Sequence, residues 1–266
     1  MPPLFYEQAG LASEIYGQRT SLLPVIRGDA RFYGDLAREA GGPILELGCG
    51  EGRFLIPFAR SGFDITGIDR SKVMLDRARQ AVARLEPRDA SRITVVHGDM
   101  TDFRLQTQFG FVFSAFRSFM FITEPEAQRR CLERVRDHLR PGGILAIDIF
   151  DPLLDRMVPD LDTEDWSFQG TVPHPDSFNL VLIQAISRAN DPLSQVFEET
   201  WRYSEHDREG NQLRQEEEVL RMRWTYRYEM RYLLELAGFE VVAEYSDYLK
   251  SPPAYGKEQI WVARKP

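Results

Sequence analysis

Short apolar runs alternate with helical patterns along the first half of the chain. Buried strands are predicted by the apolar runs at 43–48, 63–69, 93–99, 109–116 and 144–150. Helices are predicted between them by apolar positions at helical spacing in 53–62, 72–85 and 124–139. Ser71 is the expected N-cap of the second helix, and Thr123 with Glu126 forms the expected capping box of the third. This alternation favours an α/β fold whose parallel sheet is covered by helices on both faces.

The pattern changes after Asp151, where prolines interrupt a stretch without a long helical period. Strands are predicted there at 179–188, 194–203 and 212–224, followed by a helix at 226–237 and two closing strands at 239–245 and 258–264. We therefore expect three parts in the chain. These are an N-terminal helical cap segment at 1–40, an α/β core from 41–151 and 225–266, and an antiparallel β insertion at 152–224 that forms a lid or acceptor site.

Charge and composition narrow the classes of partner. The chain has 33 Lys and Arg against 41 Asp and Glu, a formal charge of −8, which is opposite to the basic excess of a nucleic-acid binder. No run approaches 18 apolar residues and the N-terminus has no apolar signal region, so we expect no membrane partner, no export and a cytoplasmic location. The two cysteines are expected to be reduced, and the four scattered histidines predict no metal site. Exposed strand edges in the insertion are compatible with a homodimer.

The strongest chemical signal is the turn that follows the first strand. The segment ILELGCGEGR, residues 44–53, carries Glu46 on the strand and then Gly48, Gly50 and Gly52. Glycines suit such a turn because a Cβ would block positive φ and keep backbone amides away from a ligand. A dinucleotide-binding turn has glycine at its sixth position, where this chain has Arg53. The turn therefore favours a nucleoside over a dinucleotide.

Acidic residues end the next two strands. Asp69 ends the second strand, where a carboxylate can accept hydrogen bonds from both ribose hydroxyls, in NAD as well as in other nucleosides. Asp99 ends the third strand beside Met100, where an acid can bind the exocyclic amine of adenine and the apolar neighbour can pack on the ring. Since open α/β sheets bind ligands at the carboxyl ends of their strands, these residues are expected along one edge.

At ELGCGEG, GIDRS, HGDM and LRPGG the sequence resembles class I S-adenosylmethionine-dependent methyltransferases. With the insertion and the phrase HGDMTDF, it looks more narrowly like small-molecule N-methyltransferases of the amino-sugar type. The resemblance implies a Rossmann-like, doubly wound sheet of seven strands whose last strand is antiparallel, with the β insertion before the final helix. It also implies that Gly48 and Gly50 approach the methionine part of S-adenosyl-L-methionine, Asp69 the ribose, and Asp99 with Met100 the adenine.

Further residues are expected at the cofactor. They are Glu46, Cys49 and Arg70 beside these positions, and Ser114 and Ala115 at the end of the fourth strand. Cys49 is expected as a small residue in a tight turn and not as a nucleophile.

The resemblance further implies that the N-terminal segment closes over the cofactor with an aromatic residue near the sulfonium. Tyr16 is favoured over Tyr6, since an electron-rich ring can act as a cation–π partner. The alternative is that Tyr16 only packs one helix onto the domain. Related enzymes often have a histidine base shortly after the fourth strand, where this chain has Phe121.

We expect three residues, Tyr16, Arg117 and Asp151, to contribute to substrate contact and catalysis. Arg117 follows the fourth strand and would suit an anionic group, or it forms a salt bridge with Glu124 or a neighbour. Asp151 follows the fifth strand and faces the same pocket, or it is a turn residue before proline. The aromatic stripe of Phe197, Trp201 and Tyr203 either walls an acceptor site or packs the insertion sheet.

The sequence thus predicts an enzyme that transfers a methyl group by in-line displacement to a small-molecule acceptor, with nitrogen favoured and oxygen or carbon as alternatives. Two other classes stay open. An NAD-dependent oxidoreductase would need the six-position glycine fingerprint, and a non-catalytic cofactor-binding protein would keep the same acids without turnover.

Overall fold

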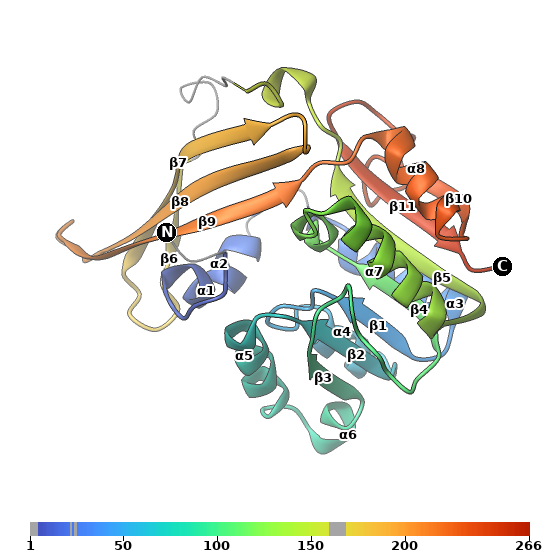
Figure 1. The fold of residues 1–266 in the computed structure, drawn as a ribbon. Coiled ribbons are helices and arrows are strands. Elements are labelled where there is room, and N and C mark those ends of the chain that lie inside the picture. The colour runs from blue at the N-terminus through green and yellow to red at the C-terminus, as the bar shows by residue number, and fades with distance from the viewer. Residues whose placement is uncertain (1–4, 22, 24–25, 160–168) are drawn as a thin grey trace. The chain divides into compact units, whose positions relative to one another are not determined.

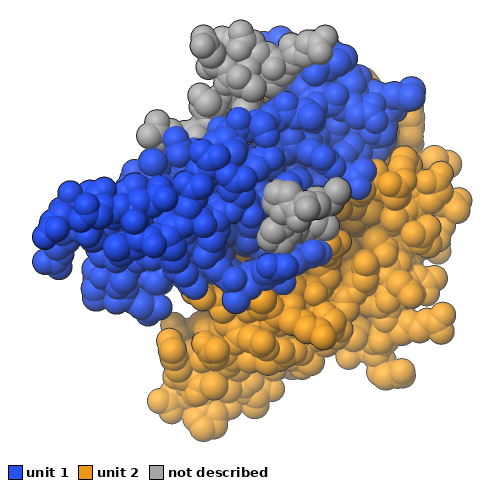
Figure 2. Space-filling model, turned by 60° about the vertical axis from the view of Figure 1, so that its left-hand side comes forward, with its two compact units in different colours: residues 1–24, 153–223 blue, residues 25–152, 224–266 orange. Residues whose placement is uncertain are grey.

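The computed structural model of the chain describes residues 5–21, 23, 26–159 and 169–266. The chain divides into two compact units, which Figure 2 shows in different colours. One unit comprises Met1–Pro24 and Leu153–Arg223, and the other comprises Val25–Pro152 and Trp224–Pro266. This division groups residues 25–40 with the α/β core and only the residues before them with the insertion.

The larger unit contains a seven-stranded sheet with the order β10-β11-β5-β4-β1-β2-β3 (Figure 1). Its strands are β1 Ile44–Leu47, β2 Ile65–Asp69, β3 Ile93–His97, β4 Phe109–Ser114, β5 Leu139–Phe150, β10 Glu240–Tyr245 and β11 Glu258–Arg264. The pairs among β1 to β5 are parallel, and β11 runs antiparallel to both β5 and β10. The predicted α/β fold with an antiparallel last strand is therefore confirmed.

Helices connect and cover these strands. They are α3 Asp29–Ala40, α4 Leu55–Arg60, α5 Lys72–Val82, α6 Pro87–Ala90, the 3-10 turn η2 Ser118–Phe121, α7 Pro125–His138 and α8 Arg227–Leu236. The core on one face of the sheet joins aromatic side chains of α3 and the segment leading into α4 with Phe111 and Phe113 of β4. Because those two residues alternate with Val112 and Ser114, the latter point to the opposite face.

Two predicted helix caps have different outcomes. Ser71 caps α5 as predicted, since its hydroxyl accepts a hydrogen bond from the Met74 amide at 3.2 Å. The capping box expected at Thr123 is wrong, because α7 begins at Pro125 and its N-cap is Glu124, which makes no side-chain cap hydrogen bond. Proline at the first helical position forces the preceding residue into an extended conformation, which moves the helix start by one residue.

The smaller unit contains a four-stranded antiparallel sheet with the order β6-β7-β8-β9. Its elements are α1 Leu11–Glu14, α2 Tyr16–Ser21, η3 Leu154–Arg156, β6 Gln169–Pro173, β7 Leu180–Asp191, β8 Val196–His206 and β9 Gln212–Arg223. Leu11, Ala12 and Ile15 pack on one face of this sheet, against side chains that include Trp201 and Tyr203. The strands β6 and β9 are its edges, and the homodimer stays a prediction.

In the part of the chain that the structure describes, no helix is both long enough and apolar enough to cross a lipid bilayer.

Candidate cofactor site

The turn after β1 follows a left-handed path at each of its three glycines. The φ angles are 73° at Gly48, 54° at Gly50 and 87° at Gly52. A Cβ added to Gly48 would lie 2.6 Å from the Cβ of Ser118. Glycine is required at Gly48 for two reasons, because the backbone is left-handed and because the loop after β4 approaches it closely.

Asp69 joins the end of β2 to this turn. Its Oδ2 accepts a hydrogen bond from the Gly50 amide at 2.8 Å, and its Oδ1 accepts one from the Ser71 amide at 2.8 Å. Burial raises the pKa of Asp69, against the lowering effect of these backbone hydrogen bonds. Each oxygen has further acceptor capacity, so the carboxylate is placed to receive hydroxyl donors beside the glycine turn.

The end of β3 reaches the same turn through Met100. The Met100 Cε would lie 3.4 Å from a Cβ on Gly48. Asp99 is exposed, and its Oδ1 accepts hydrogen bonds from the Thr101 amide and hydroxyl, both at 2.7 Å. Arg70 is exposed, and its carbonyl contacts Nε2 of His97 at 3.1 Å. The structure therefore brings the ends of β1, β2 and β3 together at one edge of the sheet, as expected.

Glu46 is the buried acid of the site. Its side chain is 3% exposed, and its Oε2 has no hydrogen-bond partner among the described residues. Burial raises the pKa of Glu46 well above its usual range, with Arg53 opposing the shift. A buried carboxyl oxygen without a donor is costly, so this position fits a ligand that brings a donor, such as an ammonium group.

Cys49 fills space in the turn. Its Cβ and Sγ would each lie 2.8 Å from a Cβ on Gly67 of β2. Burial raises the pKa of the Cys49 thiol well above its usual range, which keeps it protonated and unreactive.

Ser114 and Ala115, at the end of β4, are both buried. The Ser114 Oγ has no hydrogen-bond partner among the described residues, while the Ala115 carbonyl accepts a hydrogen bond from the Ser118 hydroxyl at 2.9 Å. Their predicted contact with the cofactor stays a prediction.

Arg117 forms a two-point contact with Glu258 of β11. Its Nε and Nη2 donate to the two carboxylate oxygens at 3.2 and 2.5 Å, and its guanidinium lies 5.3 Å from the centre of the Phe150 ring. The partner is thus a residue distant in sequence and not Glu124. An anionic acceptor at Arg117 would have to share the guanidinium with Glu258.

Asp151, just after β5, forms hydrogen bonds and an ion pair with residues of other segments. Its Oδ2 accepts from the Gly256 amide and its Oδ1 from the Gln259 side-chain amide, both at 2.8 Å, and Arg227 lies 3.4 Å away. Both oxygens are therefore engaged inside the protein, and substrate contact by Asp151 stays a prediction.

Tyr16 is the first residue of α2, in the unit that holds the four-stranded sheet. Its ring lies edge-to-face on Tyr6, with the ring centres 5.1 Å apart. Of the aromatic stripe on β8, Trp201 and Tyr203 are buried in the core that α1 forms with this sheet. The proposed role of Tyr16 at the sulfonium stays a prediction.

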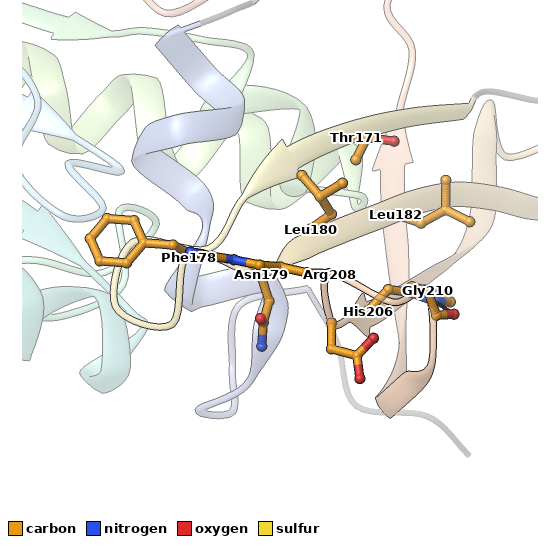
Figure 3. A pocket seen from close by; sticks show the side chains of 9 residues that line it. Thr171, Phe178, Asn179, Leu180, Leu182, His206, Arg208 and Gly210 are labelled. Atoms are coloured by element: carbon orange, nitrogen blue, oxygen red, sulfur yellow. Dashed lines mark hydrogen bonds between the residues drawn. The ribbon is translucent and has the colours of Figure 1, made fainter.

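A pocket of about 550 Å³ lies at one end of the four-stranded sheet (Figure 3). Its lining combines apolar residues such as Phe178, Leu180 and Leu182 with His206 and Arg208. It contains none of the predicted cofactor-binding residues.

Sequence reasoning missed a buried hydrogen-bond network around Asp148. The carboxylate of Asp148 accepts hydrogen bonds from the backbone amides of Phe116 and Arg117. Tyr33 and Tyr248 both donate to its carboxylate. No pattern in the sequence distinguishes these two tyrosines from other core residues.

The strand order and the glycine turn define a Rossmann-like α/β domain with a β insertion. Residues 44–143 match a protein-family model described as "Methyltransferase domain".

Three known proteins are similar to the chain. A dTDP-3-amino-3,4,6-trideoxy-alpha-D-glucopyranose N,N-dimethyltransferase from Streptomyces venezuelae is 32% identical over 105 residues, which are 40% of this chain and 41% of that protein. The CcbJ methyltransferase from Streptomyces caelestis superposes with a TM-score of 0.72 at 25% identity, over 92% of this chain and 98% of that one. CalS10, a SAM-bound amino pentose methyltransferase from Micromonospora echinaspora, superposes with a TM-score of 0.71 at 22% identity, over 98% and 99%.

Residues 44–143 are thus similar to a methyltransferase domain, the sequence resembles an amino-sugar N,N-dimethyltransferase over 105 residues, and the fold is that of an amino pentose methyltransferase. The sequence match spans about two fifths of the length of the first curated relative. The activity of the whole protein and the identity of its acceptor are therefore proposed in the next section.

Proposed function

We propose that this protein uses S-adenosyl-L-methionine to methylate a nitrogen atom of a small-molecule acceptor. The use of S-adenosyl-L-methionine is supported by one observation. The carboxylate of Asp69 accepts a hydrogen bond from the Gly50 amide at 2.8 Å. On the adjoining strand, the buried Oε2 of Glu46 has no hydrogen-bond partner among the described residues. This arrangement offers one acid to hydroxyl donors and another to a cation, the two kinds of polar group that an adenosine-bearing sulfonium amino acid presents.

The residues present fit that cofactor. Asp69 would accept from the ribose hydroxyls, Glu46 would lie toward the ammonium group, and Met100 with Asp99 would hold the adenine. When bound, the cofactor supplies an activated methyl group. The residues of the chain then have to hold the acceptor in line with that methyl, a task of positioning that needs no covalent intermediate.

Nitrogen as the acceptor atom is supported by the relatives, which are described as an amino-sugar N,N-dimethyltransferase and an amino pentose methyltransferase. The acids near the end of β5 favour an amine that arrives neutral, because Asp148 and Asp151 both use their oxygens for hydrogen bonds within the protein. A base is needed only for a protonated nucleophile.

Isothermal titration with S-adenosylhomocysteine tests the cofactor site. Asp69→Ala should weaken binding by roughly 1–3 kcal/mol, because a charged acceptor of two hydroxyl donors is lost. Asp64→Ala is the matched control, since Asp64 lies just before the other end of β2 and is exposed in an ion pair with Arg92. Equal affinity of Asp69→Ala and wild type would refute this assignment of the cofactor site.

The acceptor is tested by offering a panel of amines, phenols and carboxylates together with methyl-labelled cofactor. We expect label in amines. Label only in phenols or carboxylates would overturn the choice of nitrogen, and undiminished transfer by Arg117→Ala would rule Arg117 out as an acceptor anchor.

A further inference from the structure

The loop after β4 has a strained backbone. Phe116 and Arg117 are consecutive non-glycine residues with φ angles of 54° and 64°. Such residues carry a conformational cost and persist only where the surroundings hold them, most often at functional sites. A specific restraint must therefore hold this loop.

That restraint is the carboxylate of Asp148 on β5, which is 1% exposed. Its Oδ2 accepts the Phe116 amide at 2.9 Å and its Oδ1 accepts the Arg117 amide at 2.6 Å. The left-handed conformation is what turns two successive amides toward one carboxylate. Asp148 thus satisfies the backbone only while both residues keep this conformation.

Two tyrosines complete the hydrogen bonding of Asp148. The hydroxyls of Tyr33 on α3 and Tyr248 after β10 donate to its Oδ2 at 2.5 and 2.8 Å. Burial, followed by the charge of Asp148, raises the pKa of both hydroxyls well above their usual range, so they stay neutral donors. The carboxylate therefore has four donors from three separate segments.

The restrained loop lies against the glycine turn. Ser118 donates its hydroxyl to the Ala115 carbonyl at 2.9 Å and contacts the Gly48 carbonyl at 3.4 Å. The Cβ of Ser118 also occupies the space that a side chain at Gly48 would need. A shift of the loop would consequently move the backbone that faces the predicted methionine part of the cofactor.

We propose that Asp148 is a positioning residue for methyl transfer, which locks residues 115–118 in the conformation that shapes the cofactor-facing side of the glycine turn. This inference rests on the proposed function. Asp148 acts through the loop and not by contact with the reacting atoms.

Asp148→Asn tests the proposal. The variant replaces one carboxylate oxygen with a donor, and whichever oxygen is replaced, a backbone amide loses its acceptor. A hydroxyl can rotate to adapt, but a backbone amide cannot. We expect the Kd for S-adenosylhomocysteine to rise about tenfold. Hydrogen exchange should show lost protection at the amides of Phe116 and Arg117.

Three further variants separate positioning from general stability. Leu234→Ala creates a cavity in the buried face of α8 and should lower stability without changing the Kd. Tyr248→Phe removes one hydroxyl donor and keeps both backbone contacts, so its effect on the Kd should be smaller than that of Asp148→Asn. Phe116→Asn, added to Asp148→Asn, should recover part of the affinity relative to Asp148→Asn alone, because asparagine adopts the left-handed conformation more readily.

The outcomes distinguish the two proposals. If wild type binds S-adenosylhomocysteine and Asp148→Asn binds it equally well, the positioning role is overturned and the proposed function stands. The same holds if Leu234→Ala weakens binding as much as Asp148→Asn does. If wild type itself does not bind, the proposed function fails and the positioning role fails with it.

Discussion

The two sheets of this protein bury different kinds of side chain. The seven-stranded sheet packs aromatic rings in its interior, where Phe113 meets Tyr33, Phe54, Phe58 and Phe111. Two of its buried acids, Glu46 and Asp148, lie near the carboxyl ends of β1 and β5. These two carboxyl groups therefore lie where a ligand or a loop can contact them.

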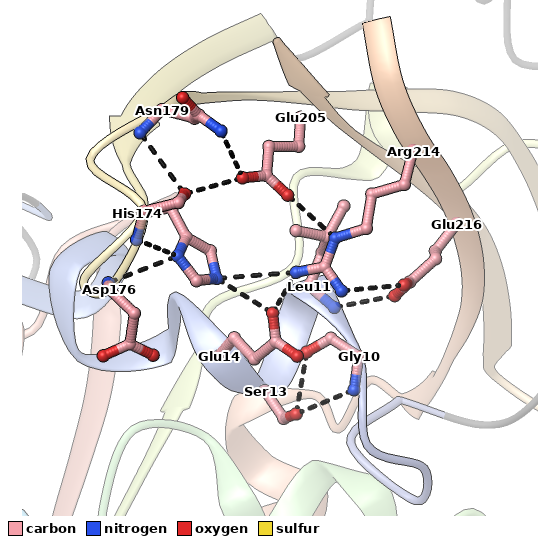
Figure 4. Close-up of polar contacts among 11 residues, drawn as sticks. Gly10, Leu11, Ser13, Glu14, His174, Asp176, Asn179, Glu205, Arg214 and Glu216 are labelled. Carbon is pink, nitrogen blue, oxygen red and sulfur yellow. Dashed lines mark hydrogen bonds and ion pairs between the residues drawn. The ribbon is translucent and has the colours of Figure 1, made fainter. Parts of the chain in front are cut away.

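The four-stranded sheet buries an ion pair between two of its strands. Arg188 of β7 lies opposite Glu199 of β8, 2.8 Å apart, and both side chains are 7% exposed. At the other end of the sheet, Arg214 contacts both Glu205 and Glu14, and His174 contacts Glu14 at 2.9 Å (Figure 4). This unit therefore combines its apolar core with a buried ion pair, and we expect a charge-removing substitution at that pair to lower its stability.

The largest effect is expected in the aromatic core. Phe113→Ala should lower the free energy of unfolding by about 3–5 kcal/mol, because the ring is fully buried and leaves a cavity among four others. Urea denaturation measures this change. Phe178→Ala is the control, since that ring is 73% exposed and its loss should change stability by less than about 0.5 kcal/mol. Similar losses for both variants would contradict the packing described for Phe113.

The next effect concerns the buried ion pair. Glu199→Ala should lower the free energy of unfolding by about 3 kcal/mol, because Arg188 stays buried without its carboxylate and the Trp201 indole loses its acceptor. The double variant Arg188→Met, Glu199→Leu should recover most of that loss, since two apolar side chains remove the uncompensated charge. Urea denaturation of both variants measures the difference. A double variant less stable than Glu199→Ala would show that Arg188 stabilises the sheet through contacts other than this pair.

The smallest effect is a dependence on acid. The Ser177 hydroxyl, with Asn179 and Arg214, lowers the pKa of Glu205 to about 2 from its usual value of 4.5. The ionised group therefore stabilises the folded state above pH 4.5, and this contribution is lost as pH falls toward 2. Between about pH 5 and about pH 3 the loss should be about 2 kcal/mol, and Glu205→Gln should remove it.

Glu218 of β9 is the control for this pH dependence. Burial raises its pKa to about 7, so it stabilises the folded state below pH 4.5, and that contribution is lost as pH rises toward 7. Glu218→Gln should therefore change the slope of stability between about pH 4.5 and 7 and leave the acidic range unaltered. Urea denaturation across both ranges measures the two slopes. An unchanged acid slope in Glu205→Gln would refute the role given to Glu205.

The sequence by itself determined the parallel sheet and the placement of the predicted cofactor-site residues. Strand periodicity is local, and the carboxyl ends of parallel strands meet at one edge, so Gly48, Asp69 and Met100 were predictable as neighbours. The cap at Ser71 was predictable for the same reason, since a cap involves only residues close in the chain.

Only the tertiary structure decided which distant residues pair. The contacts of Asp148 with Tyr33 and Tyr248 span 115 and 100 residues, and the contact of Glu14 with Arg214 spans 200. Arg117 likewise pairs with Glu258 and not with a sequence neighbour. Pairing over such separations has no periodic signature, because it depends on where the folded chain brings each side chain and not on the residues beside it.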